Sequence, residues 1–207
     1  IVYIIRIHGQ LLILAAASFI AAGSLSIRRA WIYFGIVAVA YFGSSLIFIK
    51  YNPELINERA KERENTKPWD KVLLSLYLLI GFLGTHIVAG LDSRFEWSSL
   101  DMIFMIPGTV LYIAAAFILI ISMLANKYFE AAVRIQSDRG QQVVKDGPYK
   151  IVRHPGYASV ILSFAAIPFM IGSLYALLCT AAVFIIMVAR TALEDTMMQK
   201  QLTGYSQ

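Results

Sequence analysis

The hydrophobic residues of this chain gather in long runs that are separated by short polar stretches. Six such runs cover residues 10–25, 31–49, 72–91, 102–125, 158–171 and 174–189. Several of them approach or exceed the roughly 18–20 residues that a helix needs to cross about 30 Å of hydrocarbon. Backbone polar groups in lipid must bond within their own segment, and the runs lack the two-residue alternation of a barrel strand. The pattern therefore predicts an all-α, polytopic integral membrane helical bundle with five to six membrane helices.

The fifth run is short, and its sequence predicts how it is joined to the sixth. Pro168 lies near its end, and Gly172 and Ser173 follow directly. Proline and glycine commonly mark the end of a helix and a tight turn. We therefore expect the last two membrane helices to form a helical hairpin that returns the chain to the side from which it came.

The composition agrees with a membrane protein and excludes several other classes. Hydrophobic residues make up 58% and charged residues 15% of the chain, and the mean hydropathy is +0.66. The single cysteine, Cys179, excludes an internal disulfide and a cysteine metal cluster. The net charge of +5 comes from basic residues interleaved with acidic ones, so it does not indicate a nucleic-acid partner. No spacing of His, Asp, Glu and Cys indicates a metal site.

The distribution of Lys and Arg predicts the orientation of the bundle. Most of these residues lie in the connections 50–71 and 127–153, and few lie in the other connections. By the positive-inside rule these two connections and the C-terminal tail face the cytoplasm. The chain is then a multi-pass protein of the cell membrane, which is the inner membrane in a prokaryote.

The chain divides into two regions on this reading. Residues 1–125 hold the N-terminal membrane helices and an amphipathic cytoplasmic segment near 53–66. Charges at helical spacing in that segment predict a surface helix that lies along the membrane with its charges in solvent. Residues 126–207 hold a polar loop, the helical hairpin and a C-terminal helix.

A dense polar cluster, residues 147–157 with the sequence GPYKIVRHPGY, lies between the fourth and fifth runs. Such a cluster beside hydrocarbon is costly unless it meets water, headgroups or a ligand. Pro155 suits the first turn of the fifth helix and places His154 near its N-cap. The free N–H groups of that turn form a binding edge for a carboxylate. Tyr149 and Tyr157 can stack on a heterocycle or hold a cation.

The predicted hairpin brings a second pair of charges to this loop. Arg190 precedes Glu194 by one helical turn, so both side chains share one face of the last helix. A snorkelling arginine with a helix-end salt bridge is the alternative interpretation. Together with the loop, the pair would offer a carboxylate site, a stacking surface and an acid. S-adenosylmethionine has features to match all three, although other nucleotides remain open, and no glycine-rich phosphate loop or dinucleotide fingerprint is present.

The segment GPYKIVRHPGY, followed after the hairpin by RTALEDTMM, closely resembles the isoprenylcysteine carboxyl methyltransferase and phospholipid methyltransferase family of membrane enzymes. The resemblance implies that residues 126–207 form the catalytic region and that the bound cofactor is S-adenosylmethionine, with S-adenosylhomocysteine as product. It also implies that Arg190 lies where the methyl acceptor arrives, and that Arg190 and Glu194 are the catalytic residues. The cofactor-binding residues that it implies are Gln136, Gln141, Gln142, Val143, Val144, Tyr149, His154, Pro155, Gly156, Tyr157 and Glu194.

The acceptor implied by the resemblance is a lipophilic molecule that enters from the bilayer. Arg190 favours carboxyl O-methylation of an isoprenylcysteine-like substrate, because arginine can hold a carboxylate through two hydrogen bonds. N-methylation of a phospholipid amine and S-methylation of a thiol are alternatives, and in both Glu194 or His154 would act as the base. A membrane reductase that uses NADPH and a non-catalytic membrane protein are alternatives of other classes. The oligomeric state stays open, and His86 is expected to form an interhelical hydrogen bond.

Overall fold

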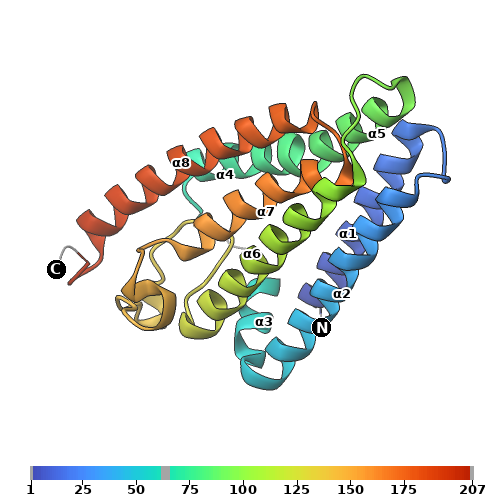
Figure 1. Ribbon diagram of the computed structural model, residues 1–207. Coiled ribbons are helices and arrows are strands. Elements are labelled where there is room, and N and C mark those ends of the chain that lie inside the picture. The colour runs from blue at the N-terminus through green and yellow to red at the C-terminus, as the bar shows by residue number, and fades with distance from the viewer. Residues whose placement is uncertain (1, 62–65, 206–207) are drawn as a thin grey trace.

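The computed structural model describes residues 2–61 and 66–205, and every regular element in that part of the chain is a helix (Figure 1). This confirms the predicted all-α class. Two short 3-10 turns, η3 (Ser137–Arg139) and η4 (Gly147–Lys150), interrupt the long loop between α6 and α7. The helices are α1 (Val2–Ala22), α2 (Arg28–Tyr51), α3 (Pro53–Ala60), α4 (Pro68–Leu76), α5 (Thr85–Phe95), α6 (Met105–Ala125), α7 (Pro155–Ile171) and α8 (Ala176–Gln201).

Within the described residues, five segments are long and apolar enough to cross a membrane. They are Val2–Ala22, Arg28–Tyr51, Pro68–Phe95, Met102–Ala125 and Ala176–Gln201, and α7 is a shorter apolar helix of 17 residues. The third segment joins α4 to α5 through a π-helical stretch, η1 (Tyr77–Gly84). The five long helices and the shorter α7 agree with the predicted number. Helix α1 starts eight residues before the first predicted run, because Arg6 and His8 interrupt the apolar pattern without interrupting the helix.

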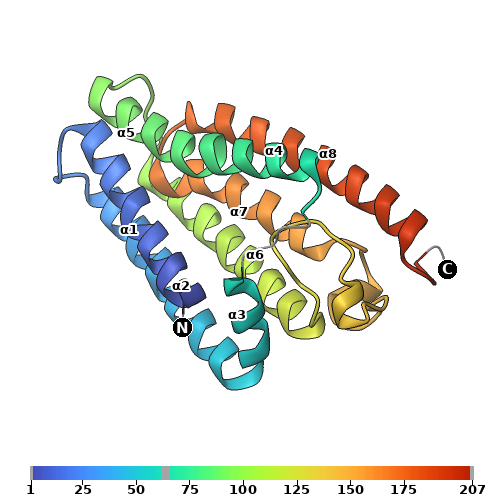
Figure 2. The same ribbon diagram turned by 180° about the vertical axis from the view of Figure 1, so that it is seen from behind.

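The helices lie roughly side by side in one elongated bundle (Figures 1 and 2). Helix α6 packs on α7, α7 packs on α8, and α1 packs on α2 and α5. The core between them is apolar, with Phe34, Val37, Phe164, Val183 and Met187 buried. Helix α3, the α6–α7 loop and the C-terminal end of α8 gather at one end of the bundle, and the α1–α2, α5–α6 and α7–α8 connections gather at the other.

The predicted hairpin is present, and a glycine forms its turn. Gly172 has a φ of +91°, a conformation that favours glycine, and its N–H donates to the Pro168 carbonyl at 2.9 Å. Pro168 itself lies inside α7 and not in the turn. Because proline lacks an N–H, the Phe164 carbonyl loses its usual donor, and the Thr180 hydroxyl of α8 donates to it at 3.0 Å. The two arms of the hairpin are thereby linked by a side chain.

A buried carboxylate ties the hairpin turn to α5. Asp92 accepts hydrogen bonds from the Ser98 N–H at 2.7 Å, the Ser98 hydroxyl at 2.6 Å and the Ser173 hydroxyl. Arg29 of α2 donates to the Met170 carbonyl at 3.1 Å at the end of α7. These contacts fix the end of the bundle that lies away from the loop.

Helix α3 closes the opposite end of the bundle. The Asn52 side chain caps it by accepting from the Leu55 N–H at 3.1 Å, and Pro53 occupies its first turn. Leu55 and Ile56 are buried against Phe48 and Met123. The amphipathic segment near 53–66 is therefore helical over Pro53–Ala60 and packs into the bundle with its apolar side, while residues 62–65 lie outside the described part. In the middle of the bundle, Tyr33 and His86 form the expected interhelical hydrogen bond, at 3.0 Å.

Candidate active site

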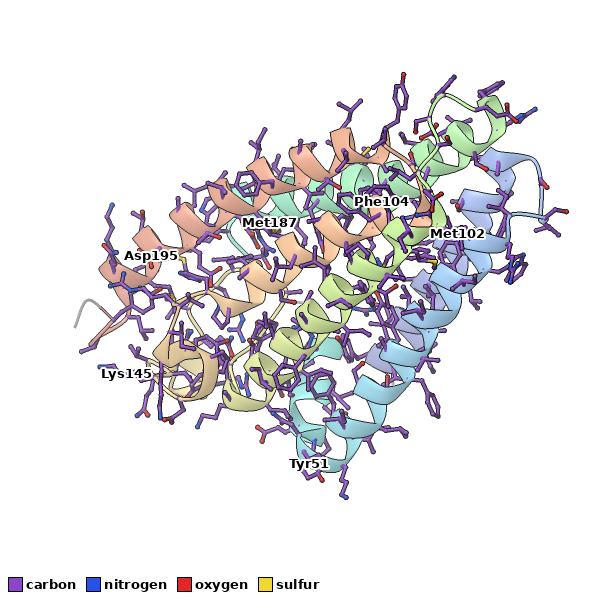
Figure 3. The ribbon with its side chains drawn as sticks, in the orientation of Figure 1. Tyr51, Met102, Phe104, Lys145, Met187 and Asp195 are labelled. Atoms are coloured by element: carbon purple, nitrogen blue, oxygen red, sulfur yellow. The ribbon has the colours of Figure 1, made fainter. Side chains whose placement is uncertain are left out.

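A cavity of about 550 Å³ opens at the end of the bundle formed by α3, the α6–α7 loop and α8. This volume lies in the range of small-molecule sites. Figure 3 shows Lys145 of the loop and Asp195 of α8 at this end of the molecule, and Met102 and Phe104 at the other. The cavity has a polar part, lined by the loop and α8, and an apolar part lined by Leu74, Leu119 and Val160.

Every residue that the sequence predicts for the site lines this one cavity. The loop, the start of α7 and the far half of α8 bring them together although they are separated by up to 58 positions in the chain. The residues are Gln136, Gln141, Gln142, Val143, Val144, Tyr149, His154, Pro155, Gly156, Tyr157, Arg190 and Glu194.

Two of the predicted glutamines hold the loop in shape. The Gln136 N–H donates to the side-chain oxygen of Gln141 at 2.7 Å, and the Gln136 amide donates to the Tyr128 carbonyl at 2.7 Å. The Tyr128 hydroxyl donates in turn to the Gly140 carbonyl at 2.9 Å. The Gln136 side chain is buried, and its hydrogen bonds stabilise the conformation of the loop.

A buried ion group supports the same loop. The Arg134 guanidinium donates to Glu130 at 2.9 Å and to Asp138 at 2.7 Å, and the Arg134 side chain is only 6% exposed. The hydrogen bond to Glu130, with the charges of Glu130 and Asp138, raises the pKa of Arg134 above its usual value, and burial opposes this. The arginine is therefore charged and fixed, and it braces the wall of the cavity.

The start of α7 has the predicted geometry. His154 is the N-cap residue and Pro155 follows it in the first turn. Gly156 is needed for a close approach, because a Cβ there would lie 2.7 Å from the ring of Phe129. The His154 side chain does not cap the helix and instead lies 3.0 Å from the Tyr205 hydroxyl, which donates to Asp195 at 2.8 Å. Tyr205, beyond the end of α8, thus lies against the start of α7.

The two tyrosines of the motif both line the cavity and make different hydrogen bonds. The Tyr157 hydroxyl donates to the Glu194 carboxylate, and the Arg190 guanidinium lies 5.4 Å from the Tyr157 ring centre. The Tyr149 hydroxyl accepts from the Asn126 amide at 3.1 Å. Burial raises the pKa of Tyr149 to about 12, the charge of Glu194 acts in the same direction, and the Asn126 hydrogen bond opposes them. Tyr149 is therefore neutral at physiological pH.

Arg190 is engaged in an ion pair that the sequence did not predict. Its guanidinium donates to Asp70 at 2.6 Å and 3.1 Å and also to the Ala131 carbonyl. Asp70 accepts a further hydrogen bond from the Val133 N–H at 2.7 Å. The Asp70 side chain is 0% and the Arg190 side chain 6% exposed. Two donors with which Arg190 would hold an acceptor carboxylate are therefore already used by Asp70, which changes how Arg190 can act.

Three residues that the sequence did not predict, Asp70, Arg59 and Tyr205, complete the site. Arg59 and Tyr205 line the cavity, and Asp70 holds a residue that lines it. The sequence offered one indication for Asp70, namely a carboxylate in the first turn of a largely apolar helix. Arg59 looked like one charge on a solvated helix face, and nothing in a single sequence distinguishes it from its neighbours. Among the described residues no group of three or more His, Cys, Asp and Glu side chains could hold a metal ion.

The fold and the cavity define a polytopic helical membrane protein with a small-molecule site at one end of its bundle. Residues 103–204 match the family model described as Phospholipid methyltransferase, so this part of the chain is similar to membrane methyltransferases. The match confirms the family resemblance, and it includes every residue that the sequence predicted for the site. No curated protein and no solved structure matches the chain significantly.

Proposed function

We propose that the protein transfers a methyl group from S-adenosylmethionine to a lipophilic acceptor. The cofactor binds in the polar part of the cavity, and the acceptor enters the apolar part from the bilayer. The observation that carries this proposal is the single cavity that joins the GPYKIVRHPGY motif and Glu194 to the apolar surface of Leu74, Leu119 and Val160. A water-soluble methyl donor and a lipid-soluble acceptor can react only in a site that offers both a polar and an apolar surface.

The residues of the polar part fit the cofactor chemically. The first turn of α7 presents free N–H groups for a carboxylate. Tyr149 and Tyr157 present aromatic rings for a heterocycle or for a positive charge. The Glu194 carboxylate can accept hydrogen bonds from an amine or from hydroxyl groups, and Tyr157 fixes its position. The cavity volume of about 550 Å³ suits a molecule of this size.

The chain contributes mainly by positioning. When bound, the cofactor supplies an electrophilic methyl group on a sulfonium centre. The protein aligns the acceptor with that methyl group and excludes water, and no covalent enzyme intermediate is needed. For a carboxylate acceptor, as in O-methylation of an isoprenylcysteine-like substrate, no proton has to be removed. For a phospholipid amine or a thiol, the Glu194 carboxylate or the His154 imidazole takes up the proton.

Arg190 provides a positive charge in the cavity wall, and the position of this charge is fixed. Asp70 and the Ala131 carbonyl hold its guanidinium beside Tyr157 and Glu194. Its charge can orient an electron-rich acceptor atom without a bidentate contact. The positive-inside rule supports a cytoplasmic orientation of this end of the bundle, where a soluble cofactor would be available.

Calorimetry on the purified protein with S-adenosylhomocysteine tests the proposal. We expect binding by the wild type and at least tenfold weaker binding by Glu194→Ala and Tyr157→Ala. Glu96→Gln is the matched control, because Glu96 is exposed at the other end of the bundle. Absence of binding to a folded wild type, or preferential binding of NADPH, would overturn the proposal. Wild-type affinity in both cavity variants would refute the assigned pocket.

The acceptor is identified by a separate measurement. Membranes that contain the protein are incubated with S-adenosylmethionine carrying a labelled methyl group, and the labelled product is analysed by mass spectrometry. A methyl ester, an N-methyl lipid and a thioether distinguish O-, N- and S-methylation. We expect a methyl ester, and the Glu194→Ala variant is expected to form none of the three products.

A further inference from the structure

Arg59 is the cation of the cavity that is least compensated by its surroundings. It comes from α3, it lines the cavity, and its Nε atom is buried without a hydrogen-bond partner in the described part of the chain. Within residues 2–61 and 66–205, the one hydrogen bond of its guanidinium runs from Nη1 to the Phe129 carbonyl at 3.3 Å. A buried donor without a partner is uncommon in a folded protein and indicates a missing acceptor.

The other arginines of the cavity have carboxylate partners. Arg190 pairs with Asp70 at 2.6 Å, Arg134 pairs with Glu130 at 2.9 Å, and Arg153 lies 3.5 Å from Asp195. Arg59 has no carboxylate within ion-pair distance over residues 2–61 and 66–205. The lysines of the cavity wall, Lys145 and Lys150, are exposed to water. Among the described residues, Arg59 is therefore the partly buried cation of the cavity that lacks a carboxylate partner.

Aromatic rings hold the Arg59 side chain in place. Its guanidinium carbon lies 5.1 Å from the ring centre of Tyr3 and 5.4 Å from that of Phe129. Both distances are within the range of cation–π attraction. The two rings hold the guanidinium, and its Nε–H has no acceptor within the described residues. Phe129 also touches the start of α7, because Gly156 allows its ring to approach.

The surroundings of Arg59 on its other side are apolar. Leu119 of α6 and Phe129 each pack against the buried cluster that contains Leu55 and Ile56 of α3. Leu74, Tyr77 and Leu119 line the cavity. A ligand that meets this combination has an anionic group and a long apolar part. A guanidinium is well suited to a carboxylate or a phosphate, since it can donate two parallel hydrogen bonds.

We infer that Arg59 is the anion-recognition residue for the acceptor, which is an amphiphile whose carboxylate or phosphate binds Arg59 while its chain lies along Leu74 and Leu119. The inference rests on the proposed methyltransferase function and names the residue that selects its acceptor. It assigns to Arg59 the recognition of charge that the sequence assigned to Arg190, because Asp70 already engages Arg190.

A photo-crosslinking experiment tests the inference. The protein is placed in nanodiscs of phosphatidylcholine and exposed to a long-chain fatty acid that carries a diazirine, or to its methyl ester, at alkaline pH where the acid is ionised. We expect the acid to label peptides around Leu74 and Leu119 several times more strongly than the ester does. Arg59→Gln should lower acid labelling to the ester level, and Arg59→Lys should keep at least half of it. Arg94→Gln is the control, because Arg94 is exposed at the other end of the bundle.

The affinity for S-adenosylhomocysteine, measured on the same variants, separates the possible sources of the anion. Unchanged affinity in Arg59→Gln with lost acid labelling supports the inference. Lost affinity with unchanged acid labelling would assign Arg59 to the cofactor and overturn it. Equal labelling of the wild type by acid and ester would also overturn it. A wild type that fails to bind S-adenosylhomocysteine but discriminates acid from ester refutes the methyltransferase proposal and leaves the anion site standing.

Discussion

Replacing Asp70 by asparagine removes one charge from the most buried ion pair of the site. The Asp70 side chain is 0% and that of Arg190 6% exposed, so water screens the pair little. The change leaves the Arg190 guanidinium buried without its counter-ion, and it weakens the acceptor of the Val133 N–H. Removal of one partner from a buried ion pair costs about 3–5 kcal/mol. We therefore expect Asp70→Asn to lower the free energy of unfolding by about that amount.

Thermal unfolding in detergent, followed by far-ultraviolet circular dichroism, measures the effect. A loss of about 3–5 kcal/mol corresponds to a decrease in Tm of roughly 6–20 °C for a protein of this size. Lys61→Gln is the control, because the Lys61 side chain is 56% exposed in its ion pair with Glu58. Exposed pairs contribute less than about 1 kcal/mol, so this variant should unfold close to the wild-type Tm.

A double variant tests whether the ion pair itself is responsible. Asp70→Leu combined with Arg190→Met removes both charges and leaves no buried ion, so it should recover most of the stability that Asp70→Asn loses. The reasoning is refuted if Asp70→Asn unfolds at the wild-type Tm, or if the double variant is as unstable as Asp70→Asn. Either result would mean that the contact holds no substantial free energy.

Three further predictions concern separate parts of the molecule. Gly156→Ala should weaken S-adenosylhomocysteine binding at least tenfold in calorimetry, because the new Cβ would lie 2.7 Å from the Phe129 ring; wild-type affinity would contradict this. Ser173→Ala should destabilise the protein by about 1–3 kcal/mol in thermal unfolding, because it removes a buried donor to Asp92, whereas exposed Ser24→Ala should have no effect. Burial raises the pKa of Tyr149 to about 12. Its contribution to the free energy of unfolding is therefore complete below the unfolded pKa of about 10 and is lost as the pH rises through the folded value. Between these two pH values, the free energy of unfolding of Tyr149→Phe should decrease less than that of the wild type.

The apolar runs were sufficient to predict the fold because each membrane helix carries its own signal. The hairpin followed from Pro168 and Gly172, although the structure places the proline inside α7. Local geometry at the site was also readable, since His154 and Pro155 specify the start of a helix through their own backbone preferences. These features depend on residues that are close in sequence.

Contacts between distant segments could not be predicted in the same way. Asp70 and Arg190 are 120 positions apart, and their pairing depends on how α4 packs against α8. The charge pattern of α3 correctly predicted a helix but not that its Leu55 and Ile56 close the bundle and carry Arg59 into the cavity. A single sequence gives the polarity of each residue and leaves its tertiary partner undefined.

The unequal arms of the α7–α8 hairpin make the protein sensitive to the thickness of its membrane. Helix α7 has 17 residues and α8 has 26, which correspond to about 26 Å and 39 Å. Measured from the start of α8, Arg190 lies about 21 Å along the helix and Glu194 about 27 Å. With a hydrocarbon layer of roughly 30 Å that begins at the hairpin turn, these positions lie near its opposite boundary. A thicker bilayer would therefore submerge the cavity and a thinner one would expose it, so lipid chain length should tune how readily a water-soluble donor reaches its partner.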